Sequence, residues 1–147
     1  MKHFKSILCP YDFSEFSDEA LAYAVKLADA DTQITLFNII ELPYLVDPNG
    51  FNYYDHKAEE IKEHSEAAMS KKMEEVYQKY PNHQFDIALA VDKDPAVLII
   101  EKQQKDQYEL VVMGSHGRKG LERLLMGSVA ESVLRGADCP VIIIKHK

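Results

Sequence analysis

Residues 108–144, YELVVMGSHGRKGLERLLMGSVAESVLRGADCPVIII, form the stretch that decides the fold. It opens and closes with short apolar runs, Tyr108 to Met113 and Val141 to Ile144, which have the length of buried strands. Between them, Val129 to Arg135 is predicted to be a helix that Gly136 ends. A crossover helix returns the chain in the same direction, so the two strands are predicted to be parallel.

The chain before this stretch alternates between strands and helices in the same way. Ser14 and Ser17 are typical helix-start residues, and Asp94-Pro95 supplies an N-cap followed by a proline at the first helical position. We predict further strands at Phe4–Pro10, Ile34–Ile40 and Phe85–Val91, and further helices after Ser17, at His56–Tyr80 and at Ala96–Gln104. The alternation predicts an α/β fold, a Rossmann-like three-layer α/β/α sandwich with a five-stranded parallel sheet and four main helices. Without a repeat or linker, residues 1–147 are expected to form a single domain.

Composition excludes several classes of protein. The 147 residues carry 17 Lys and Arg against 24 Asp and Glu, which gives a net charge of −7, and 46% of them are hydrophobic. Such a chain is globular, and its acid excess argues against broad nucleic-acid binding, although a local group of donors can still hold an anionic small ligand. No apolar stretch approaches the ~20 residues that span a bilayer, so we expect a cytoplasmic protein without a membrane partner.

Two features have more than one interpretation. Cys9 and Cys139 have neither CxxC spacing nor a histidine partner, so we expect small core residues at strand ends, with a disulfide or redox role as the alternative. Glu41 to Asp55 contains two prolines, a glycine and four aromatic residues, and is expected to be an unusually long loop. This loop either covers a site as a lid or packs on the surface.

Gly114 to Val129 is the strongest functional signal. Glycines let the backbone approach a ligand and adopt positive φ, and Gly127-Ser128 at a helix start exposes unpaired N–H groups at the positive end of the helix dipole. The pattern is typical of a loop that holds a phosphate through backbone N–H groups. A glycine-rich turn before an ordinary N-cap would have the same sequence. It is neither a Walker P-loop nor the GxGxxG dinucleotide fingerprint. Ligands of open parallel sheets bind beyond the carboxyl ends of the strands, where this segment begins.

The spacing Gly114-x-x-Gly117, nine residues, then Gly127-Ser128 matches the G-2x-G-9x-G(S/T) nucleotide motif of the universal stress protein family. The resemblance extends along the whole chain. Ile7 to Ser14 looks like the family's first strand with its following Asp-x-Ser, and Phe37 to Glu41, Asp94-Pro95, Val111 to Gly117 and Cys139 to Ile142 are similar to other family signatures. The resemblance implies the fold of the adenine nucleotide alpha hydrolases.

Members of this family with the complete motif bind ATP, so the resemblance implies a site for ATP, or for ADP or AMP. Asp12 is expected to contact the ribose hydroxyls, with capping of the first helix as its alternative role. Ile39 is expected to meet the adenine, and Val91 to line the same pocket. The residues expected to approach the ribose and the phosphates are Gly114, Gly117, Gly127, Ser128 and Val129.

The charged residues of this segment leave alternatives open. Arg118 and Lys119 either add charge near the terminal phosphate or belong to a solvated turn, and His116 either takes part in the chemistry or packs in the turn. The histidines have no metal-site spacing, and Mg²⁺ would accompany ATP mainly through phosphates and water. Glu122 and Glu131 are expected on helix surfaces, so we predict neither catalytic nor metal-ligating residues.

The resemblance further implies a homodimer through the last strand, Val141 to Ile144, because pairing across a two-fold axis would cover an apolar edge. A monomer whose edge is guarded by Lys145, His146 and Lys147 is the alternative. The favoured function is an adenine-nucleotide-binding regulatory module of the stress response. A slow ATPase and a protein-interaction module that does not use ATP are the alternatives.

Overall fold

The computed structural model describes residues 3–41, 44–50, 52–54, 57–91, 94–117 and 126–145, with only the backbone of residues 44–46, 52–54 and 57. Within these ranges one parallel sheet has the strand order β5-β2-β1-β6-β7. Its strands are β1 Ser6–Pro10, β2 Gln33–Ile40, β5 Gln84–Val91, β6 Leu110–Gly114 and β7 Val141–Ile144. The helices are α1 Glu15–Leu27, α2 Lys57–Lys79, α3 Pro95–Asp106 and α4 Ser128–Gly136. The predicted α/β fold is confirmed.

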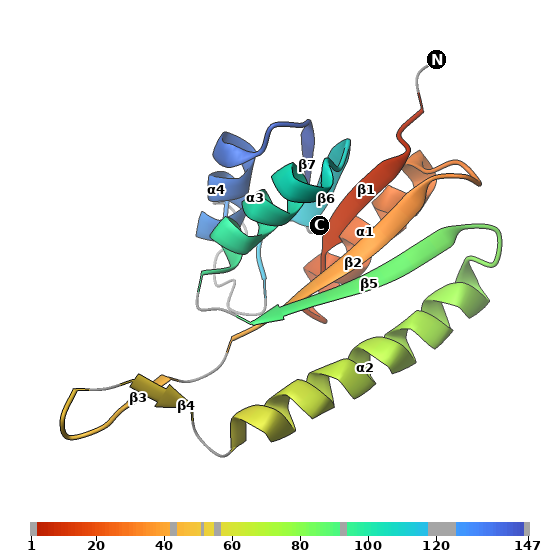
Figure 1. Cartoon of the computed structure of the whole chain (residues 1–147). Coiled ribbons are helices and arrows are strands. Elements are labelled where there is room, and N and C mark those ends of the chain that lie inside the picture. The colour runs from red at the N-terminus through yellow and green to blue at the C-terminus, as the bar shows by residue number, and fades with distance from the viewer. Residues whose placement is uncertain are drawn as a thin grey trace.

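The helices cover the sheet in two pairs, one on each face (Figure 1). Successive side chains of a strand point to opposite faces, so Ile7 of β1 packs with α1 and α2 whereas Leu8 packs with α3 and α4. The first face buries Ala24 and Met69, and the second buries Val133. In the described part of the chain, no helix is long and apolar enough to cross a membrane.

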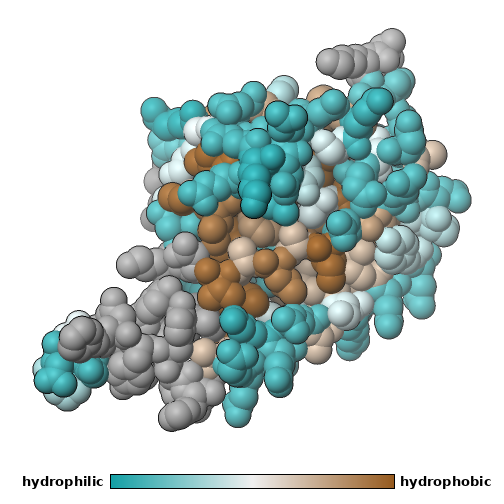
Figure 2. Space-filling view, in the orientation of Figure 1, coloured by the Kyte–Doolittle hydropathy of each residue, from teal (hydrophilic) through white to brown (hydrophobic). Residues whose placement is uncertain are grey.

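Burial falls from the middle of the sheet to its edges. Every residue of β6 is buried, as its nearly continuous apolar sequence predicts, whereas β7 is mostly half-buried. At the other edge, Figure 2 shows hydrophobic residues gathered over β2 and β5, between α3 and α2. A hollow of about 520 Å³ lies there, with Phe37, Ala88 and Leu98 among its lining residues. Helix α3 therefore covers the centre of the sheet more completely than the β5 edge.

Two helices begin with a side-chain cap and α4 does not. Ser14 Oγ accepts a hydrogen bond from the Ser17 N–H at 3.2 Å at the start of α1. Asp94 Oδ1 accepts one from the Val97 N–H at 3.4 Å before α3. Serine and aspartate are unfavourable inside a helix, but their side-chain oxygens accept hydrogen bonds from the N–H groups of its first turn. Gly127 is the N-cap of α4 and has no side chain to do the same.

The expectation that Glu41 to Asp55 is only a loop is wrong. Strands β3 Tyr44–Val46 and β4 Asn52–Tyr54 pair antiparallel as a hairpin, which lies away from the main sheet in Figure 1. Its turn is built on Asp47, whose backbone oxygen accepts from the Gly50 N–H at 2.9 Å. Asp, Pro and Gly at the first, second and fourth positions favour a tight turn. A lid role for this segment stays a prediction.

Gly136 ends α4 where predicted, but not as a left-handed cap. It is the last helical residue, Ala137 follows in an extended conformation, and Gly136 does not have a positive φ. A Cβ at Gly136 would stand 2.5 Å from Ile100 Cδ1 on α3. The glycine therefore lets α4 pack closely against α3.

Both cysteines are free thiols. Cys9 is fully buried in β1, and Cys139 is half-buried just before β7. Burial raises the pKa of the Cys9 thiol to about 12, because the thiolate would lose its hydration, and the carboxylate of Asp18 adds to this shift. Burial also raises the pKa of Cys139.

We expect a thiol reagent at about pH 8 to label Cys139 first and to spare Cys9 in the folded protein, because the thiolate is the reactive form. Mass spectrometry should count one label before denaturant is added and two afterwards. Labelling of both thiols at the same rate without denaturant would contradict the burial of β1.

Candidate functional site

A cavity of about 850 Å³ lies at the carboxyl ends of the strands. The chain places β2 and β5 on one side of β1 and then crosses back to place β6 and β7 on the other. The cavity opens at this crossover. The connections that leave neighbouring strands diverge at such a switch point, which is why open parallel sheets bind ligands there. The volume lies within the range of roughly 300–1,000 Å³ that is usual for small-molecule sites.

Asp12 lies in the turn between β1 and α1. Its Oδ1 accepts hydrogen bonds from the Ser14 N–H at 3.0 Å and from Ser17 Oγ at 2.6 Å, and its own N–H donates to Ser17 Oγ at 3.0 Å. Its Oδ2 faces Gly117, where a Cβ would stand 2.6 Å from it. Asp12 therefore takes part in the helix-start network and also lines the cavity.

The turn that carries Asp12 is held against β2. The Tyr11 N–H donates to the Phe37 oxygen at 2.8 Å, and the Tyr11 oxygen accepts from Asn38 Nδ2 at 2.8 Å. Phe13 follows with a φ of 65°, in the left-handed region that bulky residues rarely adopt. Its ring meets the Tyr11 ring edge-on, with 5.2 Å between the ring centres. The strained turn is thus fixed on both sides by packing and hydrogen bonds.

Tyr11 also connects this turn to α2. Its hydroxyl donates to Asp18 Oδ1 at 2.5 Å, and Lys72 Nζ lies 3.0 Å from the same oxygen. Burial raises the pKa of the Tyr11 hydroxyl far above its usual range, and the hydrogen bond and negative charge of Asp18 raise it further. The phenol is therefore a neutral hydrogen-bond donor, which links β1, α1 and α2 behind the cavity.

Gly114 and Gly117 are required by close packing and not by unusual backbone angles. Neither has a positive φ, contrary to the expectation for this segment. A Cβ at Gly114 would stand 2.6 Å from the Cβ of Phe16 on α1, and the Gly117 position is occupied by Asp12 Oδ2 as described above. The end of β6 therefore passes directly against α1 and its preceding turn.

Gly127 joins the start of α4 to the end of β6. Its N–H donates to the Ser115 oxygen at 2.8 Å, while the Ser115 N–H donates to the Ile144 oxygen of β7 at 2.9 Å. Gly127 also lacks a positive φ, and a Cβ there would stand 2.7 Å from the same Ser115 oxygen. Ser128 and Val129 line the cavity next to it, so the uncapped first turn of α4 faces the cavity.

The rest of the cavity wall is largely apolar and comes from three layers. Ile39 and Ile40 extend from β2, Met113 from β6, Ile99 from α3 and Ile61 from α2. A wall of this kind accepts a flat, weakly polar ring, while the glycine segment and the start of α4 offer backbone donors. The cavity therefore has an apolar part and an anion-accepting part.

The comparisons with known proteins agree with this architecture. A model of the universal stress protein family matches residues 3–145. The chain belongs to the universal stress protein family. A universal stress protein of Methanocaldococcus jannaschii is 32% identical over 145 residues, which cover 97% of this chain and 82% of that protein.

Solved structures of the universal stress protein family share the fold. Universal stress protein UspA from Lactobacillus plantarum superposes with a TM-score of 0.76 at 22% identity, over 99% of this chain and 100% of that one. A universal stress protein solved in complex with cAMP superposes with a TM-score of 0.66 at 16% identity, also over 99% and 100% of the two chains.

In this universal stress protein the cavity gathers most of the predicted site residues. They are Asp12, Ile39, Gly114, Gly117, Gly127, Ser128 and Val129. Val91 does not line the cavity and packs instead with Ile40 and Ala58. Arg118 lies outside the described residues.

Several cavity residues on β2 and α2 were not predicted from the sequence. Asn38 is a buried polar residue inside an apolar strand, and a polar residue in such a strand could have indicated a site residue. Ile61 and Ser65 are four residues apart, so they share one face of α2, but nothing in the sequence shows that this face meets the cavity.

The described wall of the cavity carries acidic side chains and no lysine or arginine. Asp12 and Glu41 are its carboxylates, and His116 is its only imidazole. Within the described ranges, no group of three His, Cys, Asp or Glu side chains is arranged to hold a metal ion. Among the described residues, an anion bound against this wall would therefore meet backbone N–H groups, the Ser128 hydroxyl and the His116 ring, and no lysine or arginine.

We expect Gly127→Ala to lower the free energy of unfolding by about 1–3 kcal/mol, because its Cβ would collide with a backbone oxygen that cannot rotate away. Gly136→Ala is the matched control in the same helix. There the added Cβ meets the Ile100 side chain, most closely at its flexible tip, and alanine's better helix propensity, about 1 kcal/mol, offsets the repacking. Urea unfolding of both variants measures the difference; equal losses would contradict the close contact at Gly127.

Proposed function

We propose that this universal stress protein is a cytoplasmic regulatory module that binds an adenine nucleotide, ATP in the first place, with ADP or AMP as alternatives. The observation that supports this most directly is the start of α4. Its first turn has no side-chain cap and lines a cavity of nucleotide size whose wall is otherwise largely apolar. A universal stress protein of the same fold has been solved with cAMP, which combines an adenine, a ribose and a phosphate.

In the proposed arrangement each part of the nucleotide meets matching chemistry. The adenine lies near Ile39, where the backbone at the end of β2 supplies polar groups for the ring edge. The ribose hydroxyls donate to Asp12, whose carboxylate is already oriented by Ser14 and Ser17. The phosphates approach Gly114 and Gly117 and accept hydrogen bonds from the residues that begin α4. Mg²⁺, if it accompanies ATP, is held mainly by phosphates and water.

The chemistry of the wall favours binding over turnover. Phosphoryl transfer needs a group that positions the nucleophile as well as donors for the phosphates. Of the two described carboxylates, Asp12 is committed to the turn before α1 and to the ribose in this proposal, and Glu41 lies on the side of the cavity formed by β2. A slow ATPase remains the second candidate function, because ATP held here would still be open to attack by water.

Isothermal titration calorimetry tests the proposal. The wild-type protein should bind ATP, and Gly127→Val should abolish binding because the side chain fills the space beside Ser115 and displaces the first turn of α4. Asp12→Asn should weaken binding by about tenfold, since an amide is a poorer acceptor for the ribose hydroxyls than a carboxylate. Gly136→Ala, distant from the cavity lining, should bind as the wild type does. Unchanged affinity in Gly127→Val, with circular dichroism showing a folded protein, would contradict the site.

We also propose that the module is a homodimer paired through β7. This strand lies at the end of the sheet, and the backbone oxygens of Pro140 and Ile144 bond inward to β6 at 3.1 Å and 2.9 Å. Because strand residues alternate, the backbone groups of Val141 and Ile143 point to the open edge. A second copy of the strand across a two-fold axis would satisfy them.

Ile143→Pro should shift the protein to a monomer in sedimentation velocity experiments, because proline removes the edge N–H that pairing would use. Ile143→Val is the matched control, since it keeps the N–H and loses a similar amount of apolar volume. The valine variant should remain a dimer. A proline variant that sediments as the wild type does would contradict pairing through this edge.

A further inference from the structure

His116 stands out among the described residues of the cavity wall. The wall contains the carboxylates of Asp12 and Glu41, and no described lysine or arginine lines it. His116 is the one described side chain of the wall that can gain a positive charge, and histidine does so between about pH 5 and pH 8.

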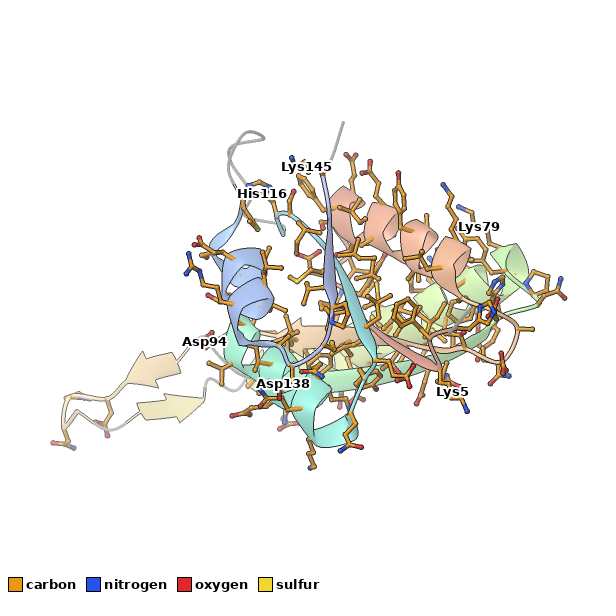
Figure 3. All side chains as sticks on the ribbon, turned by 90° about the horizontal axis from the view of Figure 1, so that it is seen from above. Lys5, Lys79, Asp94, His116, Asp138 and Lys145 are labelled. Carbon is orange, nitrogen blue, oxygen red and sulfur yellow. The ribbon has the colours of Figure 1, made fainter. Side chains whose placement is uncertain are left out.

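The ring of His116 is held in place at the end of β6, beside the start of α4 (Figure 3). Its Nδ1 lies 3.1 Å from the hydroxyl of Ser115, a buried residue. The Phe16 ring packs on it with 5.5 Å between the ring centres. Its Cδ2 lies 3.6 Å from where a Cβ of Gly127 would stand, so this side of the ring lies beside the start of α4.

The Ser115 hydroxyl suits both charge states of the ring. It can donate to a neutral Nδ1, which leaves the proton on Nε2, or accept from Nδ1–H when the imidazole is protonated. When the Ser115 hydroxyl donates to the neutral ring, Nε2 carries a hydrogen in both charge states and the ring need not turn. Protonation therefore adds a full charge to a donor whose direction is already set.

We propose that His116 binds a phosphate group of the nucleotide through Nε2–H and makes nucleotide affinity depend on pH. This inference rests on the proposed nucleotide site and adds to it a residue and a regulation. The donor lies next to Gly127, whose helix supplies the backbone N–H groups for the same phosphates. The protonated imidazole makes a charge-assisted hydrogen bond, which is roughly twice as strong as that of the neutral ring.

Other ionisable groups lie on the elements next to His116. They are Asp12 in the turn before α1, Glu15 and Glu19 on α1, Glu131 on α4 and Lys145 after β7. Lys145 follows Ile144, which bonds to the backbone of Ser115, so it ends beside His116 in Figure 3. Carboxylates and ammonium groups ordinarily keep their charge between about pH 6 and pH 8. A change in affinity within this window therefore reports on histidine or on the ligand.

The direction of the pH effect on nucleotide affinity follows from the linkage between proton binding and nucleotide binding. A polyanion binds the protonated ring better than the neutral one, so affinity rises as the pH falls and binding takes up protons. The terminal phosphate of ATP also gains a proton near pH 6, which works in the opposite direction. This contribution is the same for every variant, so the ratio of wild-type to variant affinity isolates the histidine.

Calorimetric titration with ATP at several pH values between about 6 and 8 tests the proposal on the full chain. The wild type should bind more tightly than His116→Gln, and the ratio of their affinities should grow about fivefold to tenfold from pH 8 to pH 6. His3→Gln is the matched control. His3 pairs with Asp29 at the opposite end of the sheet, so this variant should follow the wild type at every pH.

A constant ratio over this range would overturn the role of His116 while leaving the nucleotide site in place. Absence of ATP binding in the wild type at every pH would instead overturn the proposed function. NMR of the wild type gives a second measurement that needs no variant to fold. The pH midpoint of the His116 Cε1–H resonance should rise by about 0.7–1 pH unit when ATP is added, which corresponds to the same fivefold to tenfold ratio. An unchanged midpoint in the presence of bound ATP would overturn the proposal as well.

Discussion

The pairing of β1 with β6 is the constraint on which the rest of the structure depends. Ile7 and Leu8 lie beside Leu110 and Val111 in the register of this pair, across more than a hundred residues of chain. Once these strands are neighbours, β2 and β5 must continue on one side and β7 on the other. The divergence of the two halves creates the cavity, and the same pairing brings the turn of Asp12 next to Gly117. Fold and site thus have one origin.

The net charge of −7 is a poor guide to which ligand the cavity can hold. The wall around the start of α4 presents dipoles of the peptide backbone, which do not appear in a count of charged side chains. An acidic protein can therefore hold a polyanion where a helix begins without a cap. The carboxylate of Asp12, close to this wall, is compatible with such a ligand because it is aligned by Ser14 and Ser17 to accept hydrogen bonds from hydroxyls.

The fold was predictable because its strands are short apolar runs and its helices have marked starts, as at Ser14 and Asp94. The position of Val91 was not. In the register of β2 with β5, Val91 lies beside Ile40, and Ile39 lies beside Ala90. Neighbours in register share a face, so Ile40 and Val91 pack together toward α2 while Ile39 packs with the α3 and α4 side. A shift of one residue would exchange these faces, and the sequence does not set that parity.

The hairpin and the α2 wall show two further limits. Asp47, Pro48 and Gly50 were counted as loop residues, although their order is that of a tight turn between paired strands. Ile61 and Ser65 were invisible as site residues because a long amphipathic helix has several faces, and only tertiary packing selects one. By contrast, the glycine spacing from Gly114 to Gly127 identified its segment correctly, while the reason for the glycines proved to be crowding.

Two parts of the cavity wall are made of different chemical groups, and this affects how ligand binding changes as the sequence diverges. Around Gly127 the wall consists largely of peptide groups, and their N–H donors stay in place under substitutions that add no Cβ at a glycine. The wall formed by Ile61 and Ser65 is made of side chains on an exposed helix, where each substitution alters shape or polarity directly. Selectivity for one ligand over another can therefore drift through α2 while the capacity to hold an anion persists unchanged.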